Sequence, residues 1–501
     1  MKMGQTLGIA LLTLLAWTAI ASAQTPFAPG KWTKVAAAPP SVIGHTLLLT
    51  DGSVLAINAG CSATGNWYRL VPDSTGSYLK GSWVNAGTLP AGYNPLYFAS
   101  AVLPSGNVII MGGEYNACKA DWTTKGAIYN FNSNHWSNVA APAGWTSVGD
   151  AQSVVLPNGK FMLANCCTED QAIATVTGLS VTWAPTGAGK FDINDEEGWT
   201  LLPNGKVLAV DAYVGSYDPS GTNSESYNPA IGKWSSAGST VVQLWDSAAA
   251  CPPTGASQEV GPAVLRPDGT VFATGANACG AGNTSIFDTK TGIWSAGPVF
   301  PGALDVADGP AALLRNGNVL VDASPLIFKN GSKFFEWDGT TLNPTAAPPG
   351  AALNPSYAGN MLVLPTGQIL FTDFSSTVSV YTPVGTACAG CAPSITSVAA
   401  TLTHGSLNNA IHGKQFNGLS QGAAYGDDAQ SATNYPLVRI TDASGHVVYC
   451  KTHGFSTMGV ATGSQIVSAL FDIPASIALG PAKLVVVTNG IPSPAKVVTI
   501  N

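Results

Sequence analysis

Charged side chains are scarce in this sequence. They make up 10% of its 501 residues, and lysine and arginine together number 21. No run of basic residues occurs, so the electrostatic pattern of a nucleic-acid-binding protein is missing. Long apolar runs are also missing after residue 23, whereas a membrane-spanning helix needs about 20 apolar residues. We therefore expect no nucleic-acid partner and no membrane-spanning segment after signal cleavage.

The N-terminus has the pattern of a secretory signal peptide. Lys2 precedes an apolar run over residues 7–20, and Ala21-Ser22-Ala23 supplies the small residues of a cleavage site. The run is short for a membrane anchor. We predict a signal peptide over residues 1–23 and a secreted or periplasmic mature protein.

One sequence motif recurs along the chain and determines the predicted fold. An apolar stretch, a tight turn with glycine and a second apolar stretch follow one another, as in AVLPSGNVIIMGG and TLLPNGKVLAVDA. Each copy predicts a β-hairpin whose glycine takes a positive φ. The copies lie 46 to 64 residues apart, a period typical of kelch repeats. The turn glycines are Gly52, Gly106, Gly159, Gly205, Gly269, Gly317 and Gly367.

The two ends of the repeat region indicate how the fold closes. Most hairpins are followed by an aromatic residue and, seven residues on, by a tryptophan, the pattern of a second hairpin. The last repeat reaches Tyr381 without such a tryptophan, whereas Trp32 has no hairpin before it. We therefore expect the Trp32 strand to complete the seventh blade, which leaves no open sheet edge.

These patterns predict an all-β protein, in agreement with its 56 glycines and 34 prolines. A seven-bladed kelch-type β-propeller is expected over residues 30–385, and a linker over residues 386–393. Residues 394–501 contain about seven short strands with turn signals, which predicts an immunoglobulin-like β-sandwich.

The repeats, the sandwich and the closing sequence GPAKLVVVTNGIPSPAKVVTIN together resemble galactose oxidase and its relatives, the copper radical oxidases. The resemblance covers nearly the whole mature chain. It implies a kelch propeller, an early-set immunoglobulin-like domain and a copper site. We expect no counterpart of the N-terminal sugar-binding domain of galactose oxidase, because the repeats begin directly after the predicted signal peptide. Fold alone does not determine function.

The copper site implied by the resemblance is incomplete in this chain. The family uses a cysteine in blade one, a tyrosine in blade two and a Tyr-His pair in blade seven. Counting nine residues back from the turn glycines places Ile43 at the cysteine, Tyr97 at the first tyrosine, and Tyr357-Ala358 at the Tyr-His pair. The radical cofactor needs the tyrosine–cysteine thioether, and copper needs nitrogen ligands. We therefore predict that no copper radical site assembles.

The family also takes one histidine ligand from its C-terminal domain. Thr452-His453 matches that Thr-His pair, so His453 is expected to point into the propeller channel. Tyr97, Tyr357 and His453 would then remain as the remnant of a metal site, with His45 as a further neighbour. Asp427-Asp428 is interpreted as a turn of the sandwich.

The same count from the turn glycines places carboxylates where several inner strands begin. Asp150, Glu196 and Asp308 match directly, Glu259 matches after one extra residue, and Glu197 lies beside this ring. Carboxylates ligate Ca²⁺ and accept hydrogen bonds from sugar hydroxyls. The alternative is structural, because buried carboxylates also accept backbone N–H groups. Aromatic residues that could stack on sugar rings are Trp67, Tyr115, Trp122, Trp145 and Trp245.

The nine cysteines suit an oxidising compartment, and their odd number leaves at least one thiol unpaired. Their positions after or between neighbouring hairpins favour three pairs, and two adjacent cysteines are candidates for a vicinal bond. The expected scheme is Cys61–Cys118, Cys251–Cys279, Cys388–Cys391 and Cys166–Cys167, with Cys450 free.

Three functions fit these observations. The first is a non-catalytic propeller that binds carbohydrate or another envelope or extracellular component without copper. The second is a copper radical oxidase of alcohols or aldehydes. The third is a metal-dependent hydrolase or lyase that uses the acidic ring. The missing copper ligands disfavour the second, and no nucleophile–base pair favours the third. We expect a binding protein rather than an enzyme, with no required cofactor, and leave copper and calcium open.

Overall fold

The computed structural model describes residues 27–501 except 62–64, 214–220, 247–256, 278–280 and 327. This part of the chain is all-β and contains no α-helix, only the short 3₁₀ helices η2 (Ala351–Leu353) and η3 (Ser356–Ala358). Within the same residues, no helix is long and apolar enough to cross a membrane. The predicted signal peptide and the predicted Cys251–Cys279 pair lie outside the described residues.

Antiparallel four-stranded sheets follow one another from residue 31 to residue 382. The first three contain β2 (Ile43–Leu48), β3 (Val54–Asn58), β4 (Asn66–Val71), β5 (Ser82–Thr88); β7 (Ala99–Val102), β8 (Val108–Met111), β11 (Gly126–Asn130), β12 (His135–Val139); and β13 (Ser153–Val155), β14 (Phe161–Ala164), β15 (Gln171–Thr177), β16 (Ser180–Thr186). The next two contain β17 (Trp199–Leu201), β18 (Val207–Val210), β19 (Asn223–Asn228), β20 (Lys233–Ser239); and β21 (Ala263–Leu265), β22 (Thr270–Thr274), β23 (Thr284–Asp288), β24 (Ile293–Ala296).

Two further sheets complete this series. They contain β25 (Ala311–Leu313), β26 (Val319–Ala323), β27 (Lys333–Trp337), β28 (Leu342–Thr345); and β29 (Asn360–Val363), β30 (Ile369–Thr372), β31 (Ser379–Thr382), β1 (Lys31–Lys34). A small ribbon of β6 (Pro95–Leu96), β9 (Tyr115–Asn116) and β10 (Lys119–Ala120) adjoins the second sheet.

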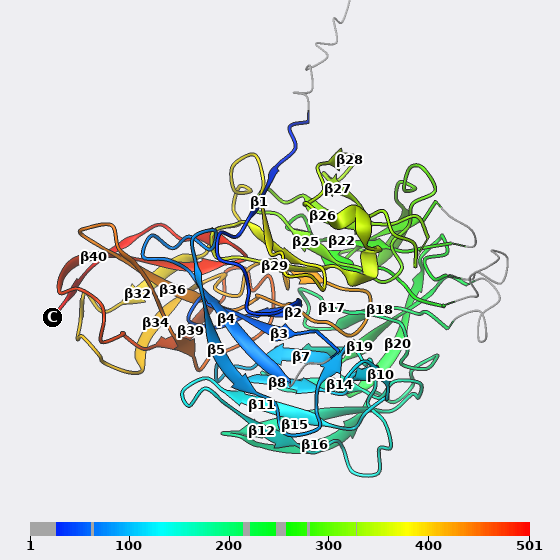
Figure 1. Ribbon diagram of the computed structural model, residues 1–501, viewed down its shortest axis with the longest axis horizontal. Coiled ribbons are helices and arrows are strands. Elements are labelled where there is room, and N and C mark those ends of the chain that lie inside the picture. Colours follow the sequence, from blue (N-terminus) through cyan, green and yellow to red (C-terminus); the bar gives the residue numbers. More distant parts are fainter. Residues whose placement is uncertain (1–26, 62–64, 214–220, 247–256, 278–280, 327) are drawn as a thin grey trace, which may run out of the picture.

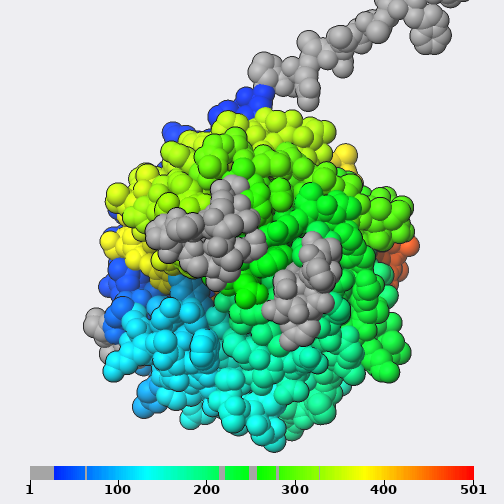
Figure 2. All heavy atoms as spheres, turned by 90° about the vertical axis from the view of Figure 1, so that its right-hand side faces the viewer, coloured from blue at the N-terminus to red at the C-terminus, as the bar shows by residue number. Residues whose placement is uncertain are grey.

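The first strands of these sheets form a closed ring. Each contacts the next in the order β2, β7, β13, β17, β21, β25, β29, and β29 contacts β2 again. Figure 2 shows the same order, since the colours run in sequence order around the face of the molecule. The turn glycines of the inner hairpins all have positive φ, between 76° and 92°. The prediction of an all-β protein with a β-propeller fold is confirmed.

The N-terminal strand closes the ring as predicted. β1 pairs antiparallel with β31, with Trp32 opposite Tyr381. The Trp32 indole packs against Phe334, Phe371 and Tyr381, and its Nε1 donates to Ala346 O at 2.7 Å. The last sheet therefore has its outer strand from the start of the chain and its other strands from residues 360–382.

Two sheets formed by the C-terminal region face each other across a separate core. One contains β32 (Ser394–Val398), β34 (Asn409–Lys414), β39 (Ile466–Phe471) and β38 (Thr452–His453). The other contains β33 (Thr401–Leu402), β42 (Lys496–Ile500), β40 (Gly480–Thr488), β36 (Leu437–Asp442) and β37 (Val447–Cys450), with β41 (Ile491–Pro492) on β40. Ile411 and Phe471 of the first sheet pack in one core with Val438 and Val486 of the second. We call this region the sandwich.

The sandwich lies against the hairpin turns of the ring, a side that we call the turn face (Figure 1). Thr452 N donates to Thr50 O at 3.2 Å, Gly454 N to Pro104 O at 2.7 Å, and Met458 N to Pro157 O at 3.0 Å. The opposite side, where the inner strands begin, is called the rim face. Figure 2 is viewed from that opposite side.

One segment of the C-terminal region, residues 420–435, leaves the sandwich and runs inside the ring. We call it the threading segment. Its short strand β35 (Ala423–Ala424) pairs with β25 and also contacts β21 and β29. On the other sides, Ser431 Oγ donates to Thr46 O and Ser100 Oγ donates to Gln430 O, both at 3.1 Å. Leu201 N donates to Gln421 Oε1 at 2.7 Å. Since these partners belong to β2, β7, β17 and β25, the segment occupies the centre of the ring.

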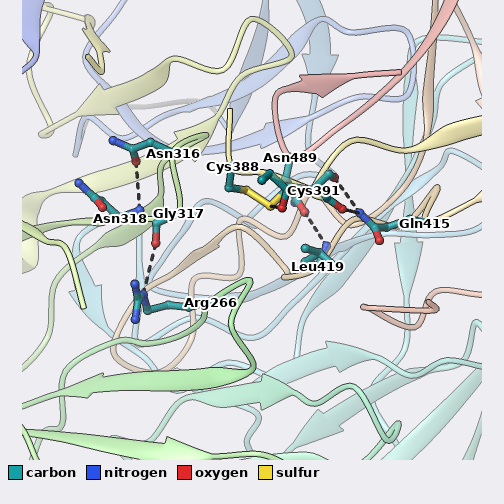
Figure 3. Close-up of a disulfide and its surroundings, with 11 residues drawn as sticks. Arg266, Asn316, Gly317, Asn318, Cys388, Cys391, Gln415, Leu419 and Asn489 are labelled. Carbon is teal, nitrogen blue, oxygen red and sulfur yellow. Dashed lines mark hydrogen bonds between the residues drawn. A yellow bond between two sulfur atoms is a disulfide. The ribbon is translucent and has the colours of Figure 1, made fainter. Parts of the chain in front are cut away.

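Disulfides stabilise the loops at two places. Cys388 and Cys391 are joined where the chain passes from ring to sandwich, and Figure 3 shows their surroundings. Cys388 N donates to Arg315 O of the ring at 2.8 Å, and Gln415 Nε2 donates to Cys391 O at 2.8 Å. Cys61 and Cys118 form the second disulfide. Both pairs agree with the predicted scheme, and Cys450 is an unpaired, buried thiol.

Removal of the closing tryptophan should destabilise the protein strongly. Trp32 is 9% exposed and fills the space between three aromatic rings, so Trp32→Ala should cost about 3–5 kcal/mol. We expect a clearly lower midpoint in thermal unfolding. Trp122→Ala is the control, because Trp122 is 56% exposed and should leave the midpoint nearly unchanged. Equal midpoints for both variants would contradict closure through β1.

Candidate functional site

The threading segment delivers three functional side chains to the rim face. At its tip, Gly426 passes so close to the ring that an added Cβ would lie 2.7 Å from both Asp308 Oδ1 and Val260 O. Tyr425, on one side of Gly426, donates its hydroxyl to Tyr357 O at 2.6 Å. Asp427 and Asp428 follow on the other side and are 3% and 0% exposed.

Carboxylates of the ring and of the threading segment converge at this tip. Asp150, Glu196 and Asp427 have ligand oxygens that all lie within 4.8 Å of one another. Glu259 and Asp308 lie beside them, because Val260, the residue after Glu259, donates its N–H to Glu196 O, and Asp308 N donates to Val260 O. We call these five residues the rim cluster. The four predicted acids therefore lie together: Asp150, Glu196, Glu259 and Asp308. Asp427 of the threading segment, which was not predicted as a site residue, lies among them.

Burial raises the pKa of every carboxyl in the rim cluster, and neighbouring carboxylates raise it further. The pKa of Asp150 rises to about 6 and that of Glu259 to about 8. The pKa values of Glu196, Asp308 and Asp427 rise well above their ordinary range for the same two reasons. The site thus holds less negative charge at neutral pH than five free carboxylates would, unless a cation is present.

The backbone at the rim is strained in a repeated way. Tyr97, Glu196 and Asp308, which lie two or three residues before the inner strands of three different sheets, have φ values of 51°, 56° and 56°. For residues with a side chain, this left-handed conformation costs on the order of 1 kcal/mol or more, and it concentrates at functional sites. The rim is also tied from sheet to sheet, because Val260 N donates to Glu196 O and Asp308 N donates to Val260 O.

Glu197 does not belong to the rim cluster, contrary to the prediction. Its carboxylate lies in a separate cluster, where Oε2 is 3.2 Å from Lys190 Nζ. Asp192, Asp211 and Glu225 surround the same ammonium group, and all five side chains are almost fully buried. Glu196 has a left-handed backbone, with a φ of 56°, and its carboxylate lies with Asp150 and Asp427, whereas that of Glu197 lies with Lys190. Lys190 was missed in the sequence.

His453 does not enter the centre of the ring, so this prediction is wrong. Its strand β38 pairs with β39 inside the sandwich, and its Nε2 lies 3.2 Å from Asp472 Oδ1. The next residue, Gly454, contacts Pro104 on the turn face, at the other end of the inner strand from Tyr97. The interpretation of Asp427-Asp428 as a turn of the sandwich is also wrong, because the threading segment places both residues at the rim.

The residues present do not fit the copper site implied by the resemblance. Ile43 stands at the cysteine position, is fully buried and offers no ligand. Ala358 occupies the position at which the resemblance implies a histidine ligand. His45 uses both ring nitrogens, one with Ser100 Oγ at 2.9 Å and the other with Asn360 Nδ2 at 3.1 Å. Burial lowers the pKa of His45 to about 3, so the ring is neutral. Tyr97 and Tyr357 do line one cavity, together with Tyr425.

A groove runs across the rim face from this cavity. Its volume is about 790 Å³, and its walls include Tyr97, Tyr357 and Phe374. Polar groups line it as well: Asn354 Nδ2 donates to Asp373 Oδ2 at 3.3 Å, and Ser375 Oγ donates to Asp373 Oδ1 at 2.5 Å. The Cys61–Cys118 disulfide forms part of the wall. The groove thus combines aromatic faces with fixed hydrogen-bonding groups.

The other predicted candidates are spread over the molecule. Trp67 is fully buried against Trp136, so it cannot meet a ligand. Tyr115 packs beside Tyr97 at a centroid distance of 6.2 Å, close to the groove. Cys166 and Cys167 are unbonded thiols with their Sγ atoms 2.7 Å apart, and Cys166 Sγ is 3.3 Å from Asp195 Oδ1.

No protein-family model and no curated protein sequence matches the chain. Among solved structures, it is similar to a fungal alcohol oxidase of the AA5 family in complex with copper, with 13% identity and a TM-score of 0.50. That match covers 95% of this chain and 100% of the oxidase. A streptogramin B lyase (12% identity, TM-score 0.45) matches over 71% of this chain and 98% of the lyase. A virginiamycin B lyase from Staphylococcus aureus (8%, TM-score 0.46) matches over 71% and 99%.

The likeness to the alcohol oxidase shows the fold alone. The chain has a galactose oxidase-like β-propeller, as the sequence resemblance implied.

The tip residues of the threading segment were missed, although the sequence contains a signal for them. Between Lys414 and Leu437 the chain has no strand longer than two residues. Connections longer than about 12–15 residues without secondary structure are uncommon in compact domains and are often functional. The charged pair Asp427-Asp428 inside such a connection was therefore a candidate for a site.

A buried carboxyl near the rim gives a pH-dependent prediction. Asp305 is 1% exposed. Burial is the main cause that raises its pKa to about 7, and repulsion from Asp246 is the second cause. The pKa of Asp305 in the folded protein lies above its value in the unfolded chain. The contribution of neutral Asp305 to the free energy of unfolding is therefore fully present below pH 4 and is lost as the pH rises to 7. Asp305→Asn cannot ionise, so its stability should exceed that of the parent at pH 8 and equal it near pH 4.

The difference at pH 8 should reach a few kcal/mol, since one pKa unit corresponds to roughly 1.4 kcal/mol. Thermal unfolding at several pH values measures it. Asp170→Asn, at an exposed position, is the control and should follow the parent at every pH. A constant offset of Asp305→Asn across the whole range would contradict the shifted pKa.

Proposed function

We propose that this protein binds a carbohydrate, or another polyhydroxylated envelope or extracellular component, in the rim-face groove and performs no copper chemistry. The groove carries this proposal, because it combines aromatic walls with fixed polar groups. Sugar rings have apolar faces that stack on aromatic side chains, and hydroxyl groups that carboxylates and amides bind. Tyr97 and Tyr357 supply such faces, while Asn354 and Asp373 supply such polar groups.

The rim cluster supports the same proposal at the inner end of the groove. Gly426 packs against Asp308 Oδ1, and its neighbour Tyr425 lies with its ring centroid 6.5 Å from that of Tyr97, so carboxylates and aromatic rings are neighbours there. A ligand that extends along the groove would present hydroxyl groups to acceptors of this kind. The groove also fits a secreted or periplasmic protein, the localisation that we propose from the signal sequence, because its wall includes a disulfide.

We interpret the finer architecture in the same terms. The described sheets from β1 to β31 are proposed to be the seven blades of a kelch-type propeller over residues 30–385, and residues 386–393 the linker. The sandwich over residues 394–501 is proposed to be an early-set immunoglobulin-like domain. Its role would be to deliver the threading segment to the rim.

Copper loading should yield no oxidase activity. Since Ile43 and Ala358 occupy the positions of the implied cysteine and histidine, no thioether can form and one nitrogen ligand is lacking. Both ring nitrogens of His45 already have hydrogen-bond partners, Ser100 and Asn360. We expect no peroxide from galactose, glyoxal or simple alcohols after incubation with Cu²⁺ in air. Stoichiometric copper together with peroxide formation would contradict the proposal and revive the oxidase alternative.

Carbohydrate binding should depend on the aromatic wall of the groove. A glycan array identifies the ligand class, and isothermal titration with the best glycan gives the affinity. Tyr357→Ala should weaken binding tenfold or more, because a stacking face is lost. Leu479→Ala, at an exposed position of the sandwich, is the control and should bind as the parent does.

Two results would overturn this proposal. One is the absence of binding to any glycan, and the other is unchanged affinity in Tyr357→Ala. Release of reducing ends from a bound glycan would instead favour the hydrolase alternative.

A further inference from the structure

Two carboxylate clusters lie near the rim face, and they differ in one respect. Asp192, Glu197, Asp211 and Glu225 surround Lys190 Nζ at N–O distances of at most 3.5 Å, so that cluster contains its own cation. The rim cluster has no such partner. Among the salt bridges of the described residues, none involves Asp150, Glu196 or Asp427.

One buried oxygen each of Asp150, Glu259 and Asp308 in the rim cluster has no hydrogen-bond partner among the described residues. Asp150 is 6% exposed, and its Oδ1 accepts no hydrogen bond from any described group. Glu259 is 8% exposed, and its Oε2 likewise has no partner among the described residues. A buried carboxylate oxygen without a hydrogen bond is costly, because it has lost its water without replacement. Such atoms indicate a ligand that supplies positive charge.

The geometry of the three nearest carboxylates suits one metal ion. Calcium binds oxygen ligands at about 2.3–2.6 Å, so two ligands of one ion lie at most about 5 Å apart. The ligand oxygens of Asp150, Glu196 and Asp427 meet this limit, since all lie within 4.8 Å of one another. A set of carboxylates is typical of hard cations, whereas copper favours nitrogen and sulfur.

We infer that Asp150, Glu196 and Asp427 form a calcium site that joins the ring to the threading segment. Asp150 and Glu196 lie just before the inner strands β13 and β17 of two neighbouring sheets, and Asp427 comes from the segment that passes through the ring. The ion would neutralise repulsion between these carboxylates and fix the tip of the segment at the rim. This site goes beyond the proposed carbohydrate groove and does not depend on it.

Calcium binding is tested on the mature protein after treatment with EGTA. Isothermal titration with CaCl₂ alone should show one ion per chain, with a dissociation constant at or below about 1 mM, the range of extracellular calcium modules. Asp427→Asn and Asp150→Asn should each weaken the affinity at least tenfold. Glu169→Gln is the control, because Glu169 is an exposed acid outside the cluster.

Thermal unfolding separates a metal ligand from a merely structural residue. Calcium should raise the unfolding midpoint of the parent and of Glu169→Gln by several degrees, since a ligand that binds only the folded state stabilises it. Without calcium, Asp427→Asn should unfold at or above the midpoint of the parent, because asparagine cannot ionise and so adds no repulsion within the cluster. With calcium, its midpoint should not change.

Terbium luminescence gives a second readout. Tyr425 lies two residues from Asp427, so Tb³⁺ at the site should be sensitised by tyrosine excitation, and Ca²⁺ should displace it. The emission should be present in Glu169→Gln and lost in Asp427→Asn.

The inference is overturned if the parent takes up no calcium at millimolar concentrations, or if both rim variants bind it as the parent does. Binding of Mg²⁺ or a transition metal in place of calcium would also overturn it. Glycan binding measured in EGTA keeps the two proposals apart: it depends on Tyr357, whereas calcium binding depends on Asp427.

Discussion

The insertion of the threading segment into the ring is the constraint on which the rest of this structure depends. The inner strands of a propeller leave one edge facing the centre, and unpaired backbone groups on such edges are costly when they are buried. Here β35 pairs with β25, and Ser431, Gln430 and Gln421 reach β2, β7 and β17. Ring and sandwich are therefore joined through the centre of the ring as well as through the turn face. Because the segment must be long enough to pass from one face to the other, its tip necessarily arrives among the residues that begin the inner strands.

This arrangement explains why so many unfavourable features gather at one place. The rim cluster buries carboxylates close together, and Tyr97, Glu196 and Asp308 hold left-handed backbone conformations. Each feature costs free energy, yet the ring can carry them because its sheets pack through large cores and its closure by β1 leaves no free seam. Local strain that the surrounding structure over-determines is a mark of function rather than of poor folding.

The sequence was sufficient for the repeat architecture and insufficient for the site. The turn glycines are local signals, and so is the unpaired Trp32 strand; both correctly predicted hairpins, their order and the closure. Counting from the same glycines also located Asp150, Glu196, Glu259 and Asp308, because position within a repeat determines position around the ring. Glu197 failed because counting from the glycines gives only the position within a repeat, whereas the contact with Lys190 places the Glu197 carboxylate in a different cluster from that of Glu196. His453 and Asp427 failed for a different reason: which loop of the sandwich enters the ring depends on contacts between residues more than 100 positions apart, such as Leu201 with Gln421.

The misplaced histidine points to what has been kept and what has changed relative to the family resemblance. In that family the C-terminal domain delivers a ligand into the propeller, and in this chain a C-terminal segment also reaches the rim. The delivered atoms are different, since Asp427 and Asp428 stand there and the histidine of the Thr-His pair stays with Asp472 in the sandwich. The residues of the ring also differ from those that the resemblance implies. Ile43 and Ala358 have no side-chain atom that binds a metal, whereas Asp150 and Glu196 have carboxylate oxygens. The groups that the ring and the threading segment bring together at this junction are carboxylates from both partners. Because both partners contribute oxygen and neither contributes a free nitrogen or sulfur ligand to this set, the chemical type of the groups matches a hard cation rather than copper, although the fold resembles that of a copper oxidase.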